Sequence, residues 1–177
     1  MTVTVWVCQI CGEAYISTTD KPARCPFCGA YEKYLIDSKE YDDTGDWDVE
    51  LNETDKANAE KALVVEISNA LFYKCSAKKV NEIDGKKLFK ILGKVESEHA
   101  AVWKKILKLK EVKWEPSETC EDNYKADLED SHAREKRAIK FYGEAAAAAT
   151  NPRVKQIFQA FVEVETDHLR LSEERLN

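Results

Sequence analysis

The helical part of this 177-residue chain repeats itself at an offset of 69 residues, and this repeat limits the fold more than any other feature. Residues 66–73 (EISNALFY) align with residues 135–142 (EKRAIKFY), and residues 95–99 (VESEH) align with residues 164–168 (VETDH). No gap is needed to superimpose the two copies. The repeat therefore predicts two similar helical hairpins that place the same acidic and histidine positions in one structure.

Helix-forming residues dominate from Thr54 onward, and apolar residues recur there at helical spacing. Breaks are expected near Gly85, around Pro116 and at residues 150–152. The connection at residues 111–121 is long enough, at roughly 3.3 Å per residue, to run the length of a bundle and leave the third helix parallel to the second. The predicted helices span residues 54–80, 85–110, 122–149 and 152–175.

The repeat keeps glutamate and histidine where an amphipathic hairpin needs only apolar residues. Glu96 and His99 are three residues apart, as are Glu165 and His168, so each pair projects from one face of its helix. Burying carboxylates on four core-facing stripes is costly unless cations neutralise them. One Glu from each of two helices with a Glu-x-x-His from each of the other two is the ligand pattern of ferritin-like di-iron and di-manganese proteins.

Six side chains therefore form a predicted two-metal site in the bundle. Oxygen-rich ligation with two imidazoles suits iron or manganese better than zinc or copper. The alternative is a polar hairpin that was duplicated for structural reasons and leaves its histidines exposed. The predicted ligands are Glu66 with His99 for one metal, Glu135 with His168 for the other, and Glu96 and Glu165 as bridges between them.

Three further side chains fall near the predicted ligands. Tyr73 and Tyr142 each lie seven residues after a ligand Glu, about two turns along the same face. There a phenol can hydrogen-bond carboxylates or bound oxygen species, or simply pack in the core, so both are candidate catalytic residues. His132 lies three residues before Glu135, but the repeat places Leu63 at the matching position. We expect His132 at the surface or beside the site rather than as a ligand.

Two CxxC pairs near the N-terminus are separated by thirteen residues, a spacing that can wrap one tetrahedral metal in four thiolates. From this spacing alone zinc is favoured, because structural zinc is the commoner occupant of such knuckles. Iron is the better expectation beside a redox-active bundle, since it can pass single electrons and zinc cannot. The remaining cysteines, Cys75 and Cys120, are expected to be free thiols without a role. The four predicted ligands are Cys8, Cys11, Cys25 and Cys28.

The composition changes along the chain and suggests three parts. Residues 1–38 combine short β-like stretches with Pro and Gly and are too few to fold on a hydrophobic core alone. Residues 39–53 are acidic and lack periodicity, as expected of a solvated linker. Residues 54–177 form the helical region. We therefore predict a mainly α protein, with a small β-rich metal domain, a linker and a four-helix bundle.

The net charge of −6 argues against a nucleic-acid partner, because the chain lacks the excess of basic residues that would attract phosphates. No run approaches the roughly 18 apolar residues of a membrane span. The first six residues lack the charged and apolar zones of a signal peptide. We therefore expect a cytoplasmic protein without a membrane partner.

These motifs resemble those of the rubrerythrins, and the order of the parts resembles the reverse rubrerythrin arrangement. The resemblance rests on residues 6–12 (WVCQICG) and 25–30 (CPFCGA), together with the six bundle ligands. It implies a rubredoxin-like domain followed by a ferritin-like bundle, and a peroxidase that reduces hydrogen peroxide at a di-iron site. It also implies electrons from rubredoxin or an NAD(P)H-dependent reductase, relayed through a tetrathiolate iron. Such proteins form homodimers in which the tetrathiolate domain of one chain lies near the di-iron site of the other.

One position departs from the family pattern. Rubrerythrins carry an extra Glu three residues after the ligand of the third helix, and here that position is Ala138, with Asn69 at the equivalent place on the first helix. The missing carboxylate keeps two other functions open. One is a ferroxidase or oxygen reductase that acts on Fe(II) or dioxygen. The other is a non-enzymatic iron-binding protein with a structural zinc at the cysteines.

Overall fold

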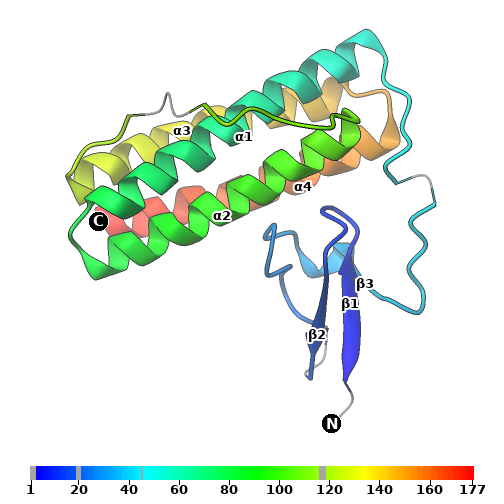
Figure 1. Ribbon diagram of the computed structural model, residues 1–177, viewed down its shortest axis with the longest axis horizontal. Coiled ribbons are helices and arrows are strands. Elements are labelled where there is room, and N and C mark those ends of the chain that lie inside the picture. The colour runs from blue at the N-terminus through cyan, green and yellow to red at the C-terminus, as the bar shows by residue number, and fades with distance from the viewer. Residues whose placement is uncertain (1–2, 19–20, 45, 116–118) are drawn as a thin grey trace.

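The computed structural model describes residues 3–18, 21–44, 46–115 and 119–177. A small antiparallel sheet lies beside a bundle of long helices (Figure 1). This arrangement confirms the predicted fold, a ferritin-like bundle preceded by a rubredoxin-like domain. None of the described helices is long and apolar enough to cross a membrane. The helices are α1 (Glu53–Lys79), α2 (Ile83–Ile106), α3 (Tyr124–Ala148) and α4 (Pro152–Leu176).

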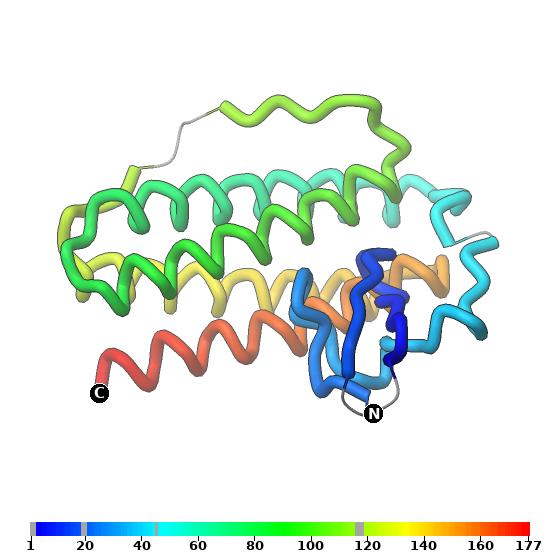
Figure 2. Tube along the Cα trace, turned by 60° about the horizontal axis from the view of Figure 1, so that its bottom comes forward, coloured from blue at the N-terminus to red at the C-terminus, as the bar shows by residue number. Residues whose placement is uncertain are grey.

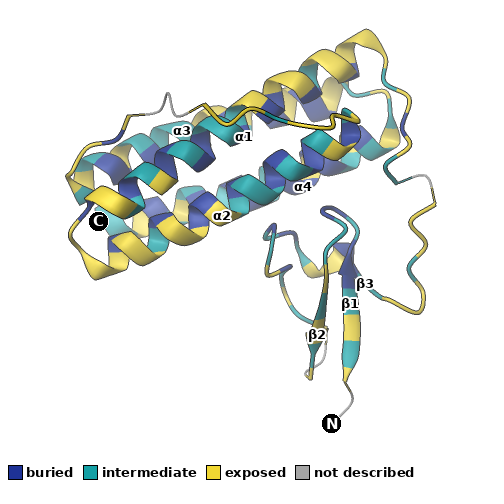
Figure 3. Cartoon of the chain, in the orientation of Figure 1, coloured by how far each residue is buried: buried dark blue, intermediate teal, exposed yellow. Residues whose placement is uncertain are grey.

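The bundle consists of two hairpins, α1 with α2 and α3 with α4, as the repeat predicts. Because the chain crosses the length of the bundle between them, α3 runs parallel to α2 (Figure 1). Asparagine side chains cap three of the helices, at Asn52, Asn123 and Asn151, each accepting a hydrogen bond from a backbone N–H of the first turn. The inward faces of the helices are buried and the outward faces exposed (Figure 3).

The ends of α2 differ from the prediction. The break near Gly85 is present, at residues 80–82, but α2 begins at Ile83, two residues before the predicted start, so Gly85 lies in its first turn. A Cβ atom at Gly85 would lie 2.8 Å from Cδ2 of Tyr124, so the close approach of that ring requires a glycine. At its other end α2 stops at Ile106 because Lys108 adopts the left-handed conformation, with φ of 52°. Pro116, where the next break was predicted, lies outside the described residues.

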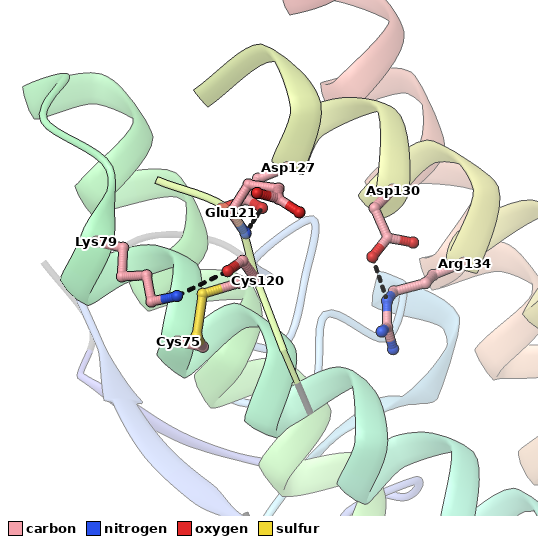
Figure 4. Close-up of a disulfide and its surroundings, with 7 residues drawn as sticks. All are labelled: Cys75, Lys79, Cys120, Glu121, Asp127, Asp130 and Arg134. Carbon is pink, nitrogen blue, oxygen red and sulfur yellow. Dashed lines mark hydrogen bonds and ion pairs between the residues drawn. A yellow bond between two sulfur atoms is a disulfide. The ribbon is translucent and has the colours of Figure 1, made fainter. Parts of the chain in front are cut away.

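The two cysteines outside the CxxC pairs form a disulfide, Cys75–Cys120, which fastens the crossover between α2 and α3 to helix α1 (Figure 4). The expectation of two free thiols was therefore wrong. Beside the disulfide, Nζ of Lys79 donates to the carbonyl oxygen of Cys120 at 2.8 Å. Forty-five residues separate the two cysteines, so only the folded bundle brings them together.

The N-terminal sheet has the strand order β2-β1-β3, with β1 (Thr4–Cys8), β2 (Ala14–Ser17) and β3 (Leu35–Asp37) all antiparallel to their neighbours. A short 3-10 helix, η1 (Glu32–Tyr34), leads into β3. The sheet and its loops lie against the α2 and α4 side of the bundle (Figure 2). Arg24 pairs with Asp167 at 2.6 Å, and Lys33 pairs with Glu163. These ion pairs join the cysteine domain to α4.

Most described residues of the predicted linker, 39–53, are exposed, but Trp47 and Val49 within it pack against the rest of the chain. The ring of Trp47 lies under two cations, with Nζ of Lys105 at 4.8 Å and the guanidinium carbon of Arg153 at 4.9 Å from its centroid. Val49 is 8% exposed. Arg153 also donates to the carbonyl oxygen of Ile10 at 3.4 Å. The segment thus helps to hold the cysteine domain on the helices of its own chain.

Candidate metal centres

The cysteine cluster is built from two similar turns, each with the pattern Cys-x-x-Cys-Gly. The N–H of Gly12 donates to the carbonyl of Cys8 at 2.8 Å, and the N–H of Gly29 donates to the carbonyl of Cys25 at 3.0 Å. Both glycines adopt a left-handed conformation, with φ of 81° and 75°, which a side chain would strain. The turns direct the thiols of Cys8, Cys11, Cys25 and Cys28, all of them buried, toward one point.

The spacing of the sulfur atoms fits a tetrahedral metal. The Sγ atoms of Cys8 and Cys28 are 3.7 Å apart, and those of Cys11 and Cys25 are 3.8 Å apart. A tetrahedron with metal–sulfur bonds of about 2.3 Å has edges of about 3.8 Å. The four thiols therefore have the separation that a single zinc or iron ion requires.

All six predicted bundle ligands meet in the core and form two overlapping groups of possible metal ligands. The ligand atoms within each group lie within 4.8 Å of one another. Glu96 and Glu165 belong to both groups, which is the position of bridging carboxylates. One group comprises Glu66, Glu96, His99 and Glu165, and the other comprises Glu96, Glu135, Glu165 and His168.

Each histidine points its Nδ1 atom at the carboxylates. Nδ1 of His99 lies 3.1 Å from Glu165 and 3.5 Å from Glu66. Nδ1 of His168 lies 2.8 Å from Glu165 and 3.1 Å from Glu96. Each imidazole thus contacts a glutamate of the other hairpin, His99 contacting Glu165 and His168 contacting Glu96. Neither hairpin alone therefore completes a group of ligands.

The cluster leaves buried polar atoms without hydrogen-bond partners. Among the described residues these include both carboxylate oxygens of Glu96 and one oxygen on each of three further glutamates. An unpartnered buried carboxylate oxygen is costly, and a bound divalent cation removes that cost. The chemistry of the donor set therefore fits two metal ions. The three glutamates are Glu66, Glu135 and Glu165.

The pKa values of the cluster residues are shifted by burial and by the charges of neighbouring cluster residues. Burial raises the pKa of Glu66 and of Glu135 well above the ordinary value. Burial alone would lower the pKa of His99, but the carboxylates of Glu66, Glu165 and Glu96 raise it well above the ordinary value. Burial acts on His168 in the same way, and there Glu165 and Glu96 raise the pKa. Protons therefore compete with a metal ion for both imidazoles and for these two carboxyls.

Two buried tyrosines connect the halves of the repeat. Tyr142 on α3 donates its hydroxyl to Oε1 of Glu66 on α1 at 2.5 Å, and Tyr73 on α1 donates to Oε1 of Glu135 on α3. The Tyr73 hydroxyl also lies 2.8 Å from Oγ of Ser131. Each tyrosine therefore contacts the glutamate of the other half rather than the one seven residues before it in the sequence.

The two clusters touch each other within one chain. Nε2 of His99 donates to the carbonyl oxygen of Cys28 at 2.9 Å, and this leaves Nδ1 facing the carboxylates. A Cβ atom at Gly29 would lie 3.0 Å from Cγ1 of Val164, so the second turn of the cysteine domain is seated directly on α4. Neither motif predicts this contact, because each is recognised by its own local spacing.

The other predicted positions lie around the cluster. His132 is half-buried, and its Nδ1 lies 3.4 Å from Oγ of Ser172 rather than among the possible ligands. Ala138 and Asn69 are 2% and 3% exposed, each one turn after a glutamate of the cluster. Neither position supplies a further carboxylate.

A family model described as Rubrerythrin matches residues 58–176. No curated protein and no solved structure matches the chain. The matched segment contains all the helical residues of the two carboxylate–histidine groups, and the four-cysteine cluster with its small sheet precedes it. The chain therefore belongs to the rubrerythrin family of non-haem iron proteins, in the reverse rubrerythrin arrangement.

Proposed function

We propose that the protein reduces hydrogen peroxide to water at an iron pair held by the bundle cluster, with electrons relayed through an iron held by the four cysteines. The observation that carries this proposal is the hydrogen bond between Nε2 of His99 and the carbonyl oxygen of Cys28. A ligand residue of one cluster is joined through it to a ligand residue of the other. Such a contact provides a short path for electrons between the clusters, in addition to orienting the His99 ring.

The iron pair would supply two electrons to the oxygen–oxygen bond, so that one peroxide and two protons become two waters. The chain contributes the surroundings of that reaction. Glu66, Glu96, His99, Glu135 and Glu165 are fully buried, so bulk water is excluded from the cluster. Glu96 and Glu165, which belong to both groups, would hold both metal ions, and each of the other four predicted ligands would hold one.

Tyr142 and Tyr73 orient the terminal carboxylates and keep a proton at each. Burial raises the pKa of both phenols well above the ordinary value, so each hydroxyl remains a hydrogen-bond donor at neutral pH. Each phenol O–H donates to a carboxylate oxygen, Tyr142 to Glu66 and Tyr73 to Glu135. A proton held there is close to the place where the reduced oxidant needs one.

The proposed electron route lies within a single chain, from Sγ of Cys28 along its backbone to the carbonyl and across to His99. A homodimer with exchanged domains, which the family resemblance suggests, is not needed to bring the clusters together and stays a prediction. A reduced rubredoxin or an NAD(P)H-dependent reductase in the cytoplasm would refill the four-cysteine iron.

The test begins with protein purified without air and reduced. About three irons for each chain and a thiolate-to-iron absorption band are expected, and one equivalent of hydrogen peroxide should oxidise the bundle iron faster than dioxygen does. The matched control carries zinc at the four cysteines and iron in the bundle. Peroxide should still oxidise this form, but a rubredoxin-type donor should no longer reduce it again. Equal re-reduction of both forms would contradict the relay.

The absence of an additional carboxylate at Ala138 supports a second candidate, a ferroxidase or oxygen reductase. Asn69 offers no carboxylate at the matching position, so the site has only the six ligands found in simpler ferritin-like centres. Rapid dioxygen consumption with Fe(II), and little peroxide turnover, would favour this candidate. A non-enzymatic role with a structural zinc requires that neither oxidant reacts rapidly. Metal analysis of the purified protein also distinguishes iron from manganese in the bundle.

A further inference from the structure

A cavity of about 370 Å³ lies in the groove between α1 and α3. Asn69 and Ala138, the two matching positions of the repeat, both line it, and each lies one helical turn after a glutamate of the bundle cluster. A water molecule occupies roughly 30 Å³ of liquid volume, so the cavity is much larger than hydrogen peroxide requires. Part of this space exists because Ala138 has no long side chain.

Positive charge surrounds the cavity. Lys61, Arg134 and Arg137 line it, and no acidic residue is among the lining residues, although the chain as a whole is acidic. Lys61 and Arg137 are exposed, whereas Arg134 is partly buried and pairs with Asp130 at 3.3 Å. An anionic group at the rim would therefore meet two accessible cations.

The inner part of the cavity has a buried donor and apolar walls. Oδ1 of Asn69 accepts from Arg134 at 3.4 Å, and within the described part of the chain Nδ2 of Asn69 has no partner. Asn69 is 3% exposed, and a buried N–H₂ group is normally paired, so an acceptor on a molecule in the cavity would satisfy it. Val64, Val65 and Phe141 supply the apolar part of the cavity lining.

We propose that the cavity, which we call the α1–α3 cavity, binds an organic hydroperoxide that carries a carboxylate. The carboxylate lies at Arg137 and Lys61, the apolar body lies along the walls, and the hydroperoxide group reaches Asn69 beside the cluster. The oxygen–oxygen bond breaks, two electrons come from the reduced iron pair and two protons are taken up, so the products are an alcohol and water. A rubredoxin-type donor restores the electrons. This inference rests on the proposed function and names its substrate class.

The first experiment measures binding without turnover. Hexanoate, which has the carboxylate and the apolar body but cannot react, is titrated into the zinc-loaded protein by calorimetry. Saturable binding is expected, about fivefold weaker in Arg137→Gln, the change expected from loss of one partly exposed ion pair. Ala138→Leu should abolish binding by filling the cavity. Lys136→Gln is the matched control, because this exposed residue on the same helix does not line the cavity, and it should bind like the wild type.

The second experiment compares 6-hydroperoxyhexanoate with hydrogen peroxide as oxidants of the reduced iron protein. Arg137→Gln should lower the ratio of their kcat/KM values by about fivefold, and Lys136→Gln should not change it. No hexanoate binding, or equal binding by all variants, overturns the cavity assignment even when hydrogen peroxide turnover is fast. A third outcome is saturable hexanoate binding that Arg137→Gln weakens, without turnover of any peroxide. This outcome would support the carboxylate site and overturn the proposed function.

Discussion

The carbonyl oxygen of Cys28 lies 2.9 Å from Nε2 of His99, which joins the two candidate metal clusters by one hydrogen bond. This bond fixes the imidazole tautomer, because a carbonyl can only accept, and it leaves Nδ1 available to a metal. His168 occupies the matching position of the repeat, and its Nδ1 faces the carboxylates in the same way. The contact with the cysteine domain therefore distinguishes two histidines that the sequence repeat makes equivalent.

Replacing Gly29 by alanine should slow electron transfer between the clusters. The residue has φ of 75°, and a Cβ atom there would lie 3.0 Å from Val164, so the side chain would push the Cys28 carbonyl away from His99. Gly12→Ala is the control, because φ is 81° and its Cβ atom would meet Trp47 instead. Each change should cost about 1–2 kcal/mol of stability. Stopped-flow reduction of the bundle iron should slow only for Gly29→Ala, and equal slowing would contradict the route.

Removing a bridging carboxylate should empty the bundle of most of its metal. Glu96→Ala and Glu165→Ala each remove a residue that belongs to both ligand groups. Glu98→Ala is the control, since Glu98 is outside both groups, and its metal content should be unchanged. Metal analysis after dialysis measures the difference. Two bound metal ions in either bridging variant would refute the ligand assignment.

Removing one hydroxyl should weaken the nearer metal. Tyr142→Phe deletes the hydrogen bond to Oε1 of Glu66 and should reduce affinity at that site by about 2 kcal/mol, roughly 30-fold. Tyr124→Phe is the control, because its hydroxyl donates to the exposed carboxylate of Asp84 at 3.0 Å, far along the chain from any cluster residue. Competition with a chelator measures the affinity. A purely packing role for Tyr142 predicts no difference between the two variants.

Metal binding in the bundle should become tighter as the pH rises. The pKa values of Glu66, Glu135, His99 and His168 are raised above their ordinary values, so protons compete with the metal for these groups and are released when it binds. Affinity for Zn²⁺ should therefore fall as the pH is lowered from about 8 to about 6, and binding should release protons to an indicator dye. The Glu66→Gln variant should release fewer protons on Zn²⁺ binding than the wild type. Affinity that is independent of pH would contradict this protonation pattern.

Opening the disulfide should destabilise the bundle. Cys75 and Cys120 close a loop over a separation of 45 residues, and in the chain-entropy account such a loop contributes about 4 kcal/mol to the free energy of unfolding. Cys120→Ser and chemical reduction of the wild type should lower that free energy by similar amounts in urea unfolding. Chemical reduction should not change the free energy of unfolding of the Cys120→Ser variant. A further loss when the variant is reduced would point to a different disulfide.

Local patterns in the sequence predict the helices and bring the six candidate ligands together, because the repeat and the Glu-x-x-His spacing are set within single helices. They do not predict what depends on packing between distant segments. The bond between Cys75 and Cys120, the seat of Gly29 on Val164 and the burial of Val49 all require the folded bundle. The crossed contacts of Tyr73 and Tyr142 were missed for the same reason, since spacing along one helix does not show which neighbour a side chain meets.

The placement of the cysteine domain has a consequence for the survival of its own thiolates. That domain lies against α2 and α4 (Figures 1 and 2), whereas all the residues that line the α1–α3 cavity come from α1 and α3. Reductant and oxidant would then reach the metal pair from opposite directions. If peroxide enters through the cavity, as we propose, the bundle stands between it and the four cysteines. That placement would shield the thiolates from the oxidation to which exposed thiolates are prone.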